Sequence, residues 1–198
     1  MDKKKLSVRT LTKIALLSAV AGVLMLFEIP LWFAPNFYQL DLSELAVMIG
    51  ALSMGPVAGM FIELIKILLN FVLNGTITGG VGEAANFIIG CSFVLPAAWL
   101  YQKKKDKKAM LLGFGAGIVC LIIVGAFANY FVLLPVYAAV FGQPLEFFVA
   151  MGQALNPLIV DLPTFTLYAV VPFNLLKGLV VSLLTFLIYP KLKSAVEN

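Results

Sequence analysis

The chain has 198 residues, of which 62% are hydrophobic and only 12% are charged, with a formal net charge of +4 at pH 7. A mean hydropathy of +1.02 excludes an ordinary soluble domain, so the chain is predicted to be an integral membrane protein. Histidine is absent, and the two cysteines, Cys91 and Cys120, fall in separate apolar segments. The composition therefore excludes a disulfide framework, which needs several cysteines, and a metal site built from cysteine and histidine ligands.

The apolar segments predict the fold class. They are long and lack the period-two alternation of outer-membrane strands, so a helical bundle is the fold that satisfies every backbone polar group in lipid. We expect one all-α membrane domain over residues 1–198. Its six transmembrane helices are expected at about residues 11–29, 42–54, 57–73, 84–101, 109–137 and 166–188.

The first predicted helix carries small residues at four-residue spacing, with Ala15 and Ala19 on one strip and Ser18 and Gly22 on a neighbouring strip. Small side chains at this spacing allow two helices to approach closely. Packing inside the bundle explains the same pattern equally well. The apolar run is too long for the core of a signal peptide, so we expect a retained helix.

Residues 30–41 form the first predicted outer loop, in which two prolines and four aromatic residues favour an ordered cap at the membrane interface. A simple aromatic belt is the alternative. Tyr38 and Leu40 lie at the end of this loop. A short apolar helix follows, for which Asp41 or Ser43 can serve as the N-cap.

Basic residues gather in three clusters, before residue 14, between residues 103 and 108, and after residue 190. The positive-inside rule places all three in the cytoplasm, so an even number of spans must separate each pair. This requires the short segment 42–54 to cross, which gives six spans with both termini in the cytoplasm. Residues 102–108 then form a cytoplasmic loop, and residues 30–41, 74–83 and 138–165 lie outside.

The third predicted helix places Glu63, Lys66 and Asn70 on one face. Opposite charges three residues apart favour a structural ion pair, and a pocket role for Lys66 is the alternative. The following glycine-rich loop contains Thr76 and is expected to act as a gate or as a simple turn. It is not a phosphate-binding loop, because no Gly-Lys-Ser/Thr follows.

The fifth apolar run is longer than a bilayer requires, so we expect it to tilt or to continue along the interface past Pro135. Residues 145–155 are too few to span and are expected to form a helix on the outer surface. Asn86 falls near the outer end of the fourth helix, and Asn129 falls in the outer half of the fifth.

The last predicted helix contains Asn174 and Lys177 on one face of an apolar span. A lysine inside a span costs about 2.5 to 3.5 kcal/mol, so it usually faces a partner, a water-filled cavity or a ligand. The alternative is that Lys177 reaches the headgroups or neutralises Glu63. With Asn86, Asn129 and Lys66 at mid-depth or in the outer half of the bundle, these residues predict an outward-opening pocket suited to a flat heterocycle with carbonyl groups.

Other functions lack the residues that they need. The chain shows no nucleophile with an adjacent base, no paired carboxylate site and no Walker motif, so we do not expect an enzyme. Six helices without a detectable inverted repeat also argue against a complete secondary transporter. A membrane-embedded enzyme using Glu63 and Lys66, or a scaffold bundle without a cavity, remain as distant alternatives.

Several motifs resemble those of a known family. They are Asp41-Leu42-Ser43-Glu44, Gly55-Pro56-Val57-Ala58-Gly59, Ala85-Asn86-Phe87, Asn129-Tyr130-Phe131-Val132-Leu133-Leu134-Pro135 and Pro172-Phe173-Asn174-Leu175-Leu176-Lys177-Gly178. They make the chain similar to the substrate-binding S components of energy-coupling factor (ECF) vitamin transporters, most closely to the riboflavin-specific RibU group. The resemblance covers nearly the whole chain.

This resemblance implies that Asn129, Asn174 and Lys177 hydrogen-bond a flavin ring while the first outer loop closes over it. Asn86, Lys66, Tyr38, Leu40 and Thr76 complete the candidate substrate-binding set. The small residues of the first helix are then expected to dock a transmembrane coupling subunit, and two cytoplasmic ATPases supply energy. Riboflavin is expected as cargo, with no cofactor, in the cell membrane of a bacterium. Another small vitamin or precursor, such as pantothenate or a pyrimidine, is the alternative.

Overall fold

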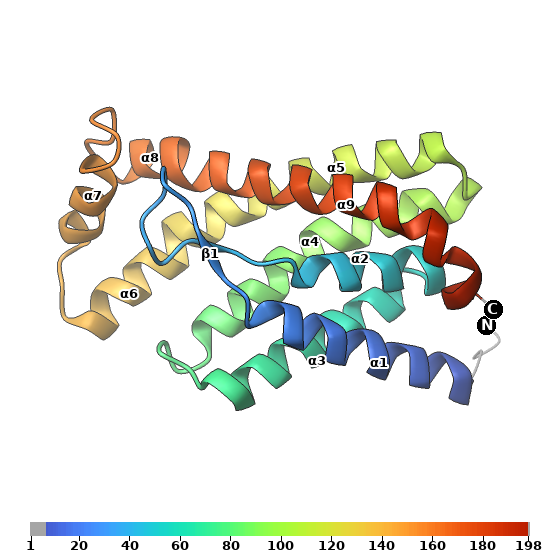
Figure 1. The fold of residues 1–198 in the computed structure, drawn as a ribbon. Coiled ribbons are helices and arrows are strands. Elements are labelled where there is room, and N and C mark those ends of the chain that lie inside the picture. Colours follow the sequence, from blue (N-terminus) through green and yellow to red (C-terminus); the bar gives the residue numbers. More distant parts are fainter. Residues whose placement is uncertain (1–6, 198) are drawn as a thin grey trace.

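The fold is described by a computed structural model, which covers residues 7–197 of the chain (Figure 1). The helices are α1 (Val8–Met25), α2 (Ser43–Met54), α3 (Pro56–Asn74), α4 (Val81–Lys104), α5 (Lys107–Ala128), α6 (Leu134–Phe141), α7 (Leu145–Gln153), α8 (Leu162–Phe165) and α9 (Val171–Glu197). Two short π-helical turns, η1 (Asn129–Leu133) and η2 (Thr166–Val170), connect α5 to α6 and α8 to α9. Strands β1 (Ile29–Pro30) and β2 (Gln39–Leu40) form a two-stranded antiparallel ladder.

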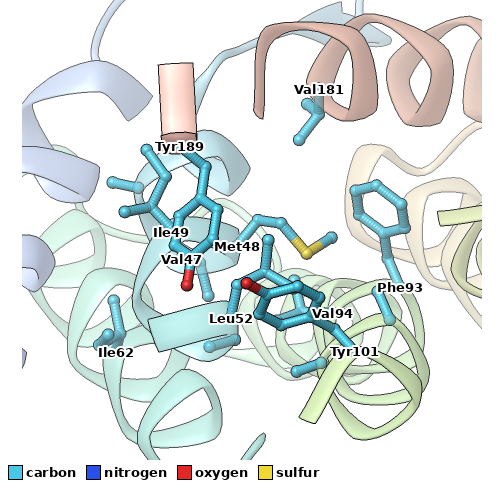
Figure 2. Close-up of a cluster of buried hydrophobic side chains, with 14 of the residues drawn as sticks. Val47, Met48, Ile49, Leu52, Ile62, Phe93, Val94, Tyr101, Val181 and Tyr189 are labelled. Atoms are coloured by element: carbon cyan, nitrogen blue, oxygen red, sulfur yellow. The ribbon is translucent and has the colours of Figure 1, made fainter. Parts of the chain in front are cut away.

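Helix α2 is the central element of the bundle. It packs against α1, α3, α4 and α9, and nine of its twelve residues are buried. A helix that is apolar all round is expected in such a position. Figure 2 shows its side chains Val47, Met48 and Leu52 among residues from the surrounding helices. Gly59 of α3 permits this packing, because a Cβ there would lie 2.5 Å from the Cβ of Ala51.

Five helical segments among the described residues are long and apolar enough to span a membrane. They are Val8–Met25, Pro56–Asn74, Val81–Lys104, Lys107–Phe141 and Leu162–Ser194. Helix α2 is shorter, since its twelve residues extend about 18 Å at 1.5 Å per residue. The all-α membrane fold is therefore supported, while six spans and the orientation of the termini remain predictions. The start of α1, the α4–α5 connection and the end of α9 lie at one end of the bundle (Figure 1).

The first helix ends earlier than the predicted residue 29. It stops at Met25, and the chain continues through β1, in which Ile29 pairs with Leu40 of β2. Leu26 and Phe27 extend the apolar pattern, so the sequence alone does not mark this end. The ladder closes the intervening loop at its base, so residues 31–38 are held between two paired strands.

Two prolines coincide with the two π-helical turns. The Leu134 N–H donates to the Asn129 carbonyl, five residues back, and Pro135 follows. The Val171 N–H donates to the Thr166 carbonyl in the same way, and Pro172 follows. A proline provides no N–H for the normal helical bond and disfavours the α conformation in the residue before it, which accounts for the local widening. The helices nevertheless continue, so the fifth run extends to Phe141 rather than to residue 137.

The final helical segment is also longer than predicted. It begins at Leu162 rather than near residue 166, because Asp161 and Thr164 form a capping box at its start. It continues to Glu197, beyond the predicted residue 188. Within the expected outer segment, α7 spans Leu145–Gln153, close to the predicted surface helix. In Figure 1, α7, α8 and the β1–β2 loop gather at the end of the bundle opposite the end of α9.

Candidate ligand-binding cavity

Lys177 of α9 is held by Asp41, the residue two positions before α2. Its Nζ lies 2.9 Å from Asp41 Oδ2. The other oxygen of Asp41 accepts hydrogen bonds from the backbone N–H of Ser43, at 2.9 Å, and from the Ser43 hydroxyl. Asp41 therefore bonds the first turn of α2 and the lysine at the same time. The alternative that Lys177 neutralises Glu63 is wrong, because Asp41 is its partner.

A second buried ionic group lies on α2 and α3. Lys66 Nζ lies 2.7 Å from Glu63 Oε1 and 2.9 Å from Glu44 Oε1. The predicted Glu63–Lys66 pair is confirmed, and Glu44 is a third member that helical spacing could not reveal. Gly90 of α4 provides the room, since a Cβ there would lie 2.3 Å from Glu63 Oε1. All three ionic side chains are nearly inaccessible to solvent.

Two asparagines are positioned by the π-helical turns. Asn129 begins η1, and its Nδ2 donates to the Gly125 carbonyl at 2.8 Å. Its Oδ1 accepts a 2.6 Å hydrogen bond from the Tyr38 hydroxyl, which ties the loop of residues 31–38 to the bundle. Asn174 follows η2, and its Nδ2 donates to the carbonyl of Val170, the last residue of that turn, at 3.0 Å. Such turns often occur at functional sites.

These groups border a cavity of about 160 Å³. Its lining includes the polar residues Asn86, Asn129, Asn174 and Lys177 and the aromatic residues Phe37, Tyr38, Tyr137 and Phe173. A neighbouring cavity of about 40 Å³ is bordered by Glu44 and Lys66. The two share Asp41, Asn86 and Lys177 in their walls, so the ionic groups lie directly beside the larger cavity.

The loop of residues 31–38 closes the larger cavity through Phe37 and Tyr38. The Phe37 ring contacts the rings of Tyr137, Phe148 and Phe165, with centroids 5.9 to 6.5 Å apart. Such pairs stabilise beyond the area that they bury. The expected ordered cap is thus present, and it packs onto α6, α7 and α8.

The structure brings most of the predicted substrate-binding residues together but leaves two apart. Leu40 is buried in the apolar cluster beneath the loop and does not border the described cavities. Thr76 is exposed, and its hydroxyl donates to Glu83 at 3.0 Å and accepts from the Gly80 N–H at 2.9 Å. Thr76 therefore stabilises its own glycine-rich loop. Lys66 borders the smaller cavity from within its ionic group.

Asp41 has a larger role than the helix cap that the sequence indicates. The N-cap of α2 is Leu42, and neither Asp41 nor Ser43 takes that position. Asp41 still accepts from the Ser43 N–H, but it is also buried, binds Lys177 and borders both cavities. The signal lay in the motif itself, because Asp41 and Glu44 are two acidic residues three positions apart at the start of an apolar helix. Two carboxylates in such a place require cationic partners.

The four small residues of α1 do not share one surface. Ala15 and Ala19 are exposed on the outside of the bundle. Ser18 and Gly22 are buried, and a Cβ on Gly22 would lie 3.2 Å from Leu69 of α3. The expectation that Ser18 and Gly22 dock a partner is therefore corrected, since they pack within this chain. Ala15 and Ala19 remain available on the surface.

These features define a class of protein, a helical membrane protein with a polar, aromatic-capped cavity at one end of the bundle. Residues 9–189 match the family described as "ECF transporter, substrate-specific component", and the chain belongs to this family. The family is a transporter component and not an enzyme family.

Similar proteins support this assignment over nearly the full length. The riboflavin transporter FmnP of Bacillus subtilis is 32% identical, covering 98% of this chain and 96% of the relative. The riboflavin transporter RibU of Staphylococcus aureus is 33% identical, covering 96% and 93%. A solved S component of a bacterial ECF transporter superposes with a TM-score of 0.72 at 31% identity, covering 96% of this chain and 98% of that one.

Proposed function

We propose that this chain is the substrate-binding S component of an ECF transporter and captures riboflavin for uptake. The observation that carries the proposal is the convergence of Asn129, Asn174 and Lys177 on one aromatic-capped cavity. The similar proteins named above are riboflavin transporters, which favours the same cargo here. Riboflavin is then a transported ligand, and no cofactor is required.

The chemistry of the cavity suits a flavin ring. The polar edge of the flavin ring carries carbonyl oxygens and one imide N–H, so the ring needs both donors and an acceptor from the protein. Asparagine amides offer two donors and one acceptor, and a lysine ammonium offers donors only. The two faces of the flavin ring are apolar and match the aromatic side chains of the cavity wall. Asn129, Asn174 and Lys177 therefore recognise the ring edge, while Phe37, Tyr38 and Phe173 cover its faces.

Binding requires the cavity to enlarge. An apolar cavity of about 150 Å³ accommodates benzene, so the present 160 Å³ is too small for a three-ring flavin with a ribityl chain. The Tyr38 hydroxyl already donates a hydrogen bond to Asn129 Oδ1. We infer that the ring displaces this hydroxyl and moves the loop of residues 31–38 outward, after which the loop covers the ligand.

The membrane arrangement follows from charge and family. We propose six spans, including α2, with both termini in the cytoplasm of a bacterial cell and the cavity opening outward. Helix α2 is too short to cross a bilayer in contact with lipid, but it packs against α1, α3, α4 and α9, so most of its residues face protein. A transmembrane coupling subunit and two cytoplasmic ATPases supply the energy for uptake.

Fluorescence titration in detergent tests the cargo. Riboflavin fluorescence should be quenched on adding the purified protein. Pantothenate and a pyrimidine should not reverse the quenching, because neither presents a three-ring face with this polar edge. Absence of riboflavin quenching, together with calorimetric binding of pantothenate or the pyrimidine, would assign the chain to a different vitamin within the same family.

A further inference from the structure

We propose that Gly125 is a positioning residue for ligand recognition, because its missing side chain sets the distance between the amides of Asn129 and Asn174. The inference rests on the proposed riboflavin binding and adds a residue that does not itself border the described cavities.

Gly125 contacts both asparagines from the last turn of α5. Its carbonyl accepts the hydrogen bond from Asn129 Nδ2 at 2.8 Å. A Cβ on Gly125 would lie 2.7 Å from Asn174 Nδ2, 3.0 Å from Cγ and 3.2 Å from Oδ1. The amide of Asn174 therefore occupies the space that a side chain on residue 125 would need. One residue thus constrains both amides, Asn129 through its carbonyl and Asn174 through its missing Cβ.

Asn174 has little room to move away from an added methyl group. It is 4% exposed, and its Nδ2 is bonded to the Val170 carbonyl at the end of η2. Helices α5 and α9 pack against each other. A methyl group on residue 125 would therefore rotate the amide or separate the two helices. Either change alters the spacing of the two amides at the cavity.

The other glycines of α5 have different surroundings. A Cβ on Gly113 or Gly117 would meet the backbone of α4, at 2.6 Å from the Ala97 carbonyl or 2.4 Å from the Phe93 carbonyl. These two glycines permit helix packing. Gly115 has open space, with no heavy atom of the described chain near its Cβ position. Gly125 is the one of the four whose Cβ would meet a polar side chain of the cavity.

The substitution Gly125→Ala isolates this contact. Alanine favours a helix more than glycine by about 1 kcal/mol, so the backbone itself does not oppose the change. The matched control is Gly115→Ala on the same helix. Riboflavin affinity, measured by fluorescence titration, should fall about tenfold or more in Gly125→Ala, as for a lost buried hydrogen bond. Gly115→Ala should bind like the wild type.

A double variant tests whether the effect passes through Asn174. Asn174→Ala removes the amide, so adding Gly125→Ala should cause no further loss beyond about twofold. Wild-type affinity in Gly125→Ala, or a clearly additive loss in the double variant, would overturn the inference while leaving the proposed function intact. If neither the wild type nor Gly115→Ala binds riboflavin, both the proposed function and this inference are overturned.

Folding provides a second measure. If Gly125→Ala does not yield folded protein, the Gly125→Ala/Asn174→Ala variant should, because the clashing amide is gone. Thermal unfolding in detergent reports this rescue. A double variant that also fails to fold would contradict the proposed contact and assign Gly125 to helix packing alone.

Discussion

Lys177 Nζ and Asp41 Oδ2 lie 2.9 Å apart, although 136 positions separate the two residues in the chain. The pair joins α9 to the start of α2 and forms part of the wall of both cavities. A ligand that takes a hydrogen bond from Lys177 must share the ammonium with Asp41 or displace the carboxylate. Such a ligand would therefore link its binding to the position of α2 through one ion pair.

Substitution of the two α9 residues should weaken riboflavin binding. Each of Lys177→Met and Asn174→Ala removes one partner of a buried hydrogen bond, which costs about 1–3 kcal/mol. This corresponds to an affinity loss of about 5-fold to 150-fold. Fluorescence titration measures the change, and size-exclusion chromatography checks that the variants are folded. Wild-type affinity in Lys177→Met would show that the lysine does not contact the ligand.

The Asp41–Lys177 pair allows stability and binding to be separated. Asp41→Asn leaves a half-buried ammonium without its charged partner, so the protein should unfold at a lower temperature. Adding Lys177→Met removes that charge and should restore part of the loss, while riboflavin binding stays weak. Thermal unfolding and titration of the same samples give both values. Recovery of binding in the double variant would contradict a ligand contact by Lys177.

The buried Glu44–Lys66–Glu63 group should be a stability element. Lys66→Met leaves two carboxylates without a cation, and breaking a buried pair in this way costs about 3–5 kcal/mol. Thermal unfolding in detergent should show a large decrease. Lys191→Met, at an exposed lysine near the end of α9, is the matched control and should change little. Equal unfolding temperatures for both variants would mean that the ionic group contributes nothing.

Local spacing predicted some of this site, but it could not predict contacts between distant segments. Glu63 and Lys66 are three residues apart on one helix, so their pairing follows from helical geometry. The partners Asp41 for Lys177 and Glu44 for Lys66 depend on how α2 packs in the bundle. No periodicity in the sequence encodes that arrangement.

The same limit applies to the fold. Apolar length placed most ends of the long helices within about four residues, but it missed the end of α9, which continues to Glu197 beyond the predicted residue 188. The end of α1 at Met25 depends on pairing of Ile29 with Leu40, which overrides an apolar pattern that continues through Phe27. The orientations of Ser18 and Gly22 likewise depend on which face of α1 meets α3. The four-residue spacing alone does not tell which of the two strips of small residues on α1 faces the bundle.

Site-directed labelling tests the proposed topology. In a background lacking Cys91 and Cys120, single cysteines at Lys105 and Lys193 should react with a membrane-impermeant thiol reagent only after the membrane is opened. A cysteine at Thr76 should react from outside in intact cells, because that residue is exposed and lies in a proposed outer loop. Labelling of Lys105→Cys in intact cells would contradict six spans.

The exposed strip of α1 should serve partner docking and not ligand binding. Leucine at both Ala15 and Ala19 should hold a partner helix away, which lowers complex formation and uptake. Riboflavin affinity of the isolated chain should stay nearly unchanged, since these residues do not border the cavity. Co-purification with the coupling subunit measures docking. Lost riboflavin binding with an intact complex would place these alanines in internal packing instead.

The most direct test of riboflavin capture is the absorption spectrum of the purified protein. Protein expressed in riboflavin-replete cells and purified in detergent should be yellow, with a flavin absorption band that elutes with the protein. The same preparation of the Asn174→Ala/Lys177→Met variant should carry far less flavin. A colourless wild-type protein that also fails to take up added riboflavin would contradict the account.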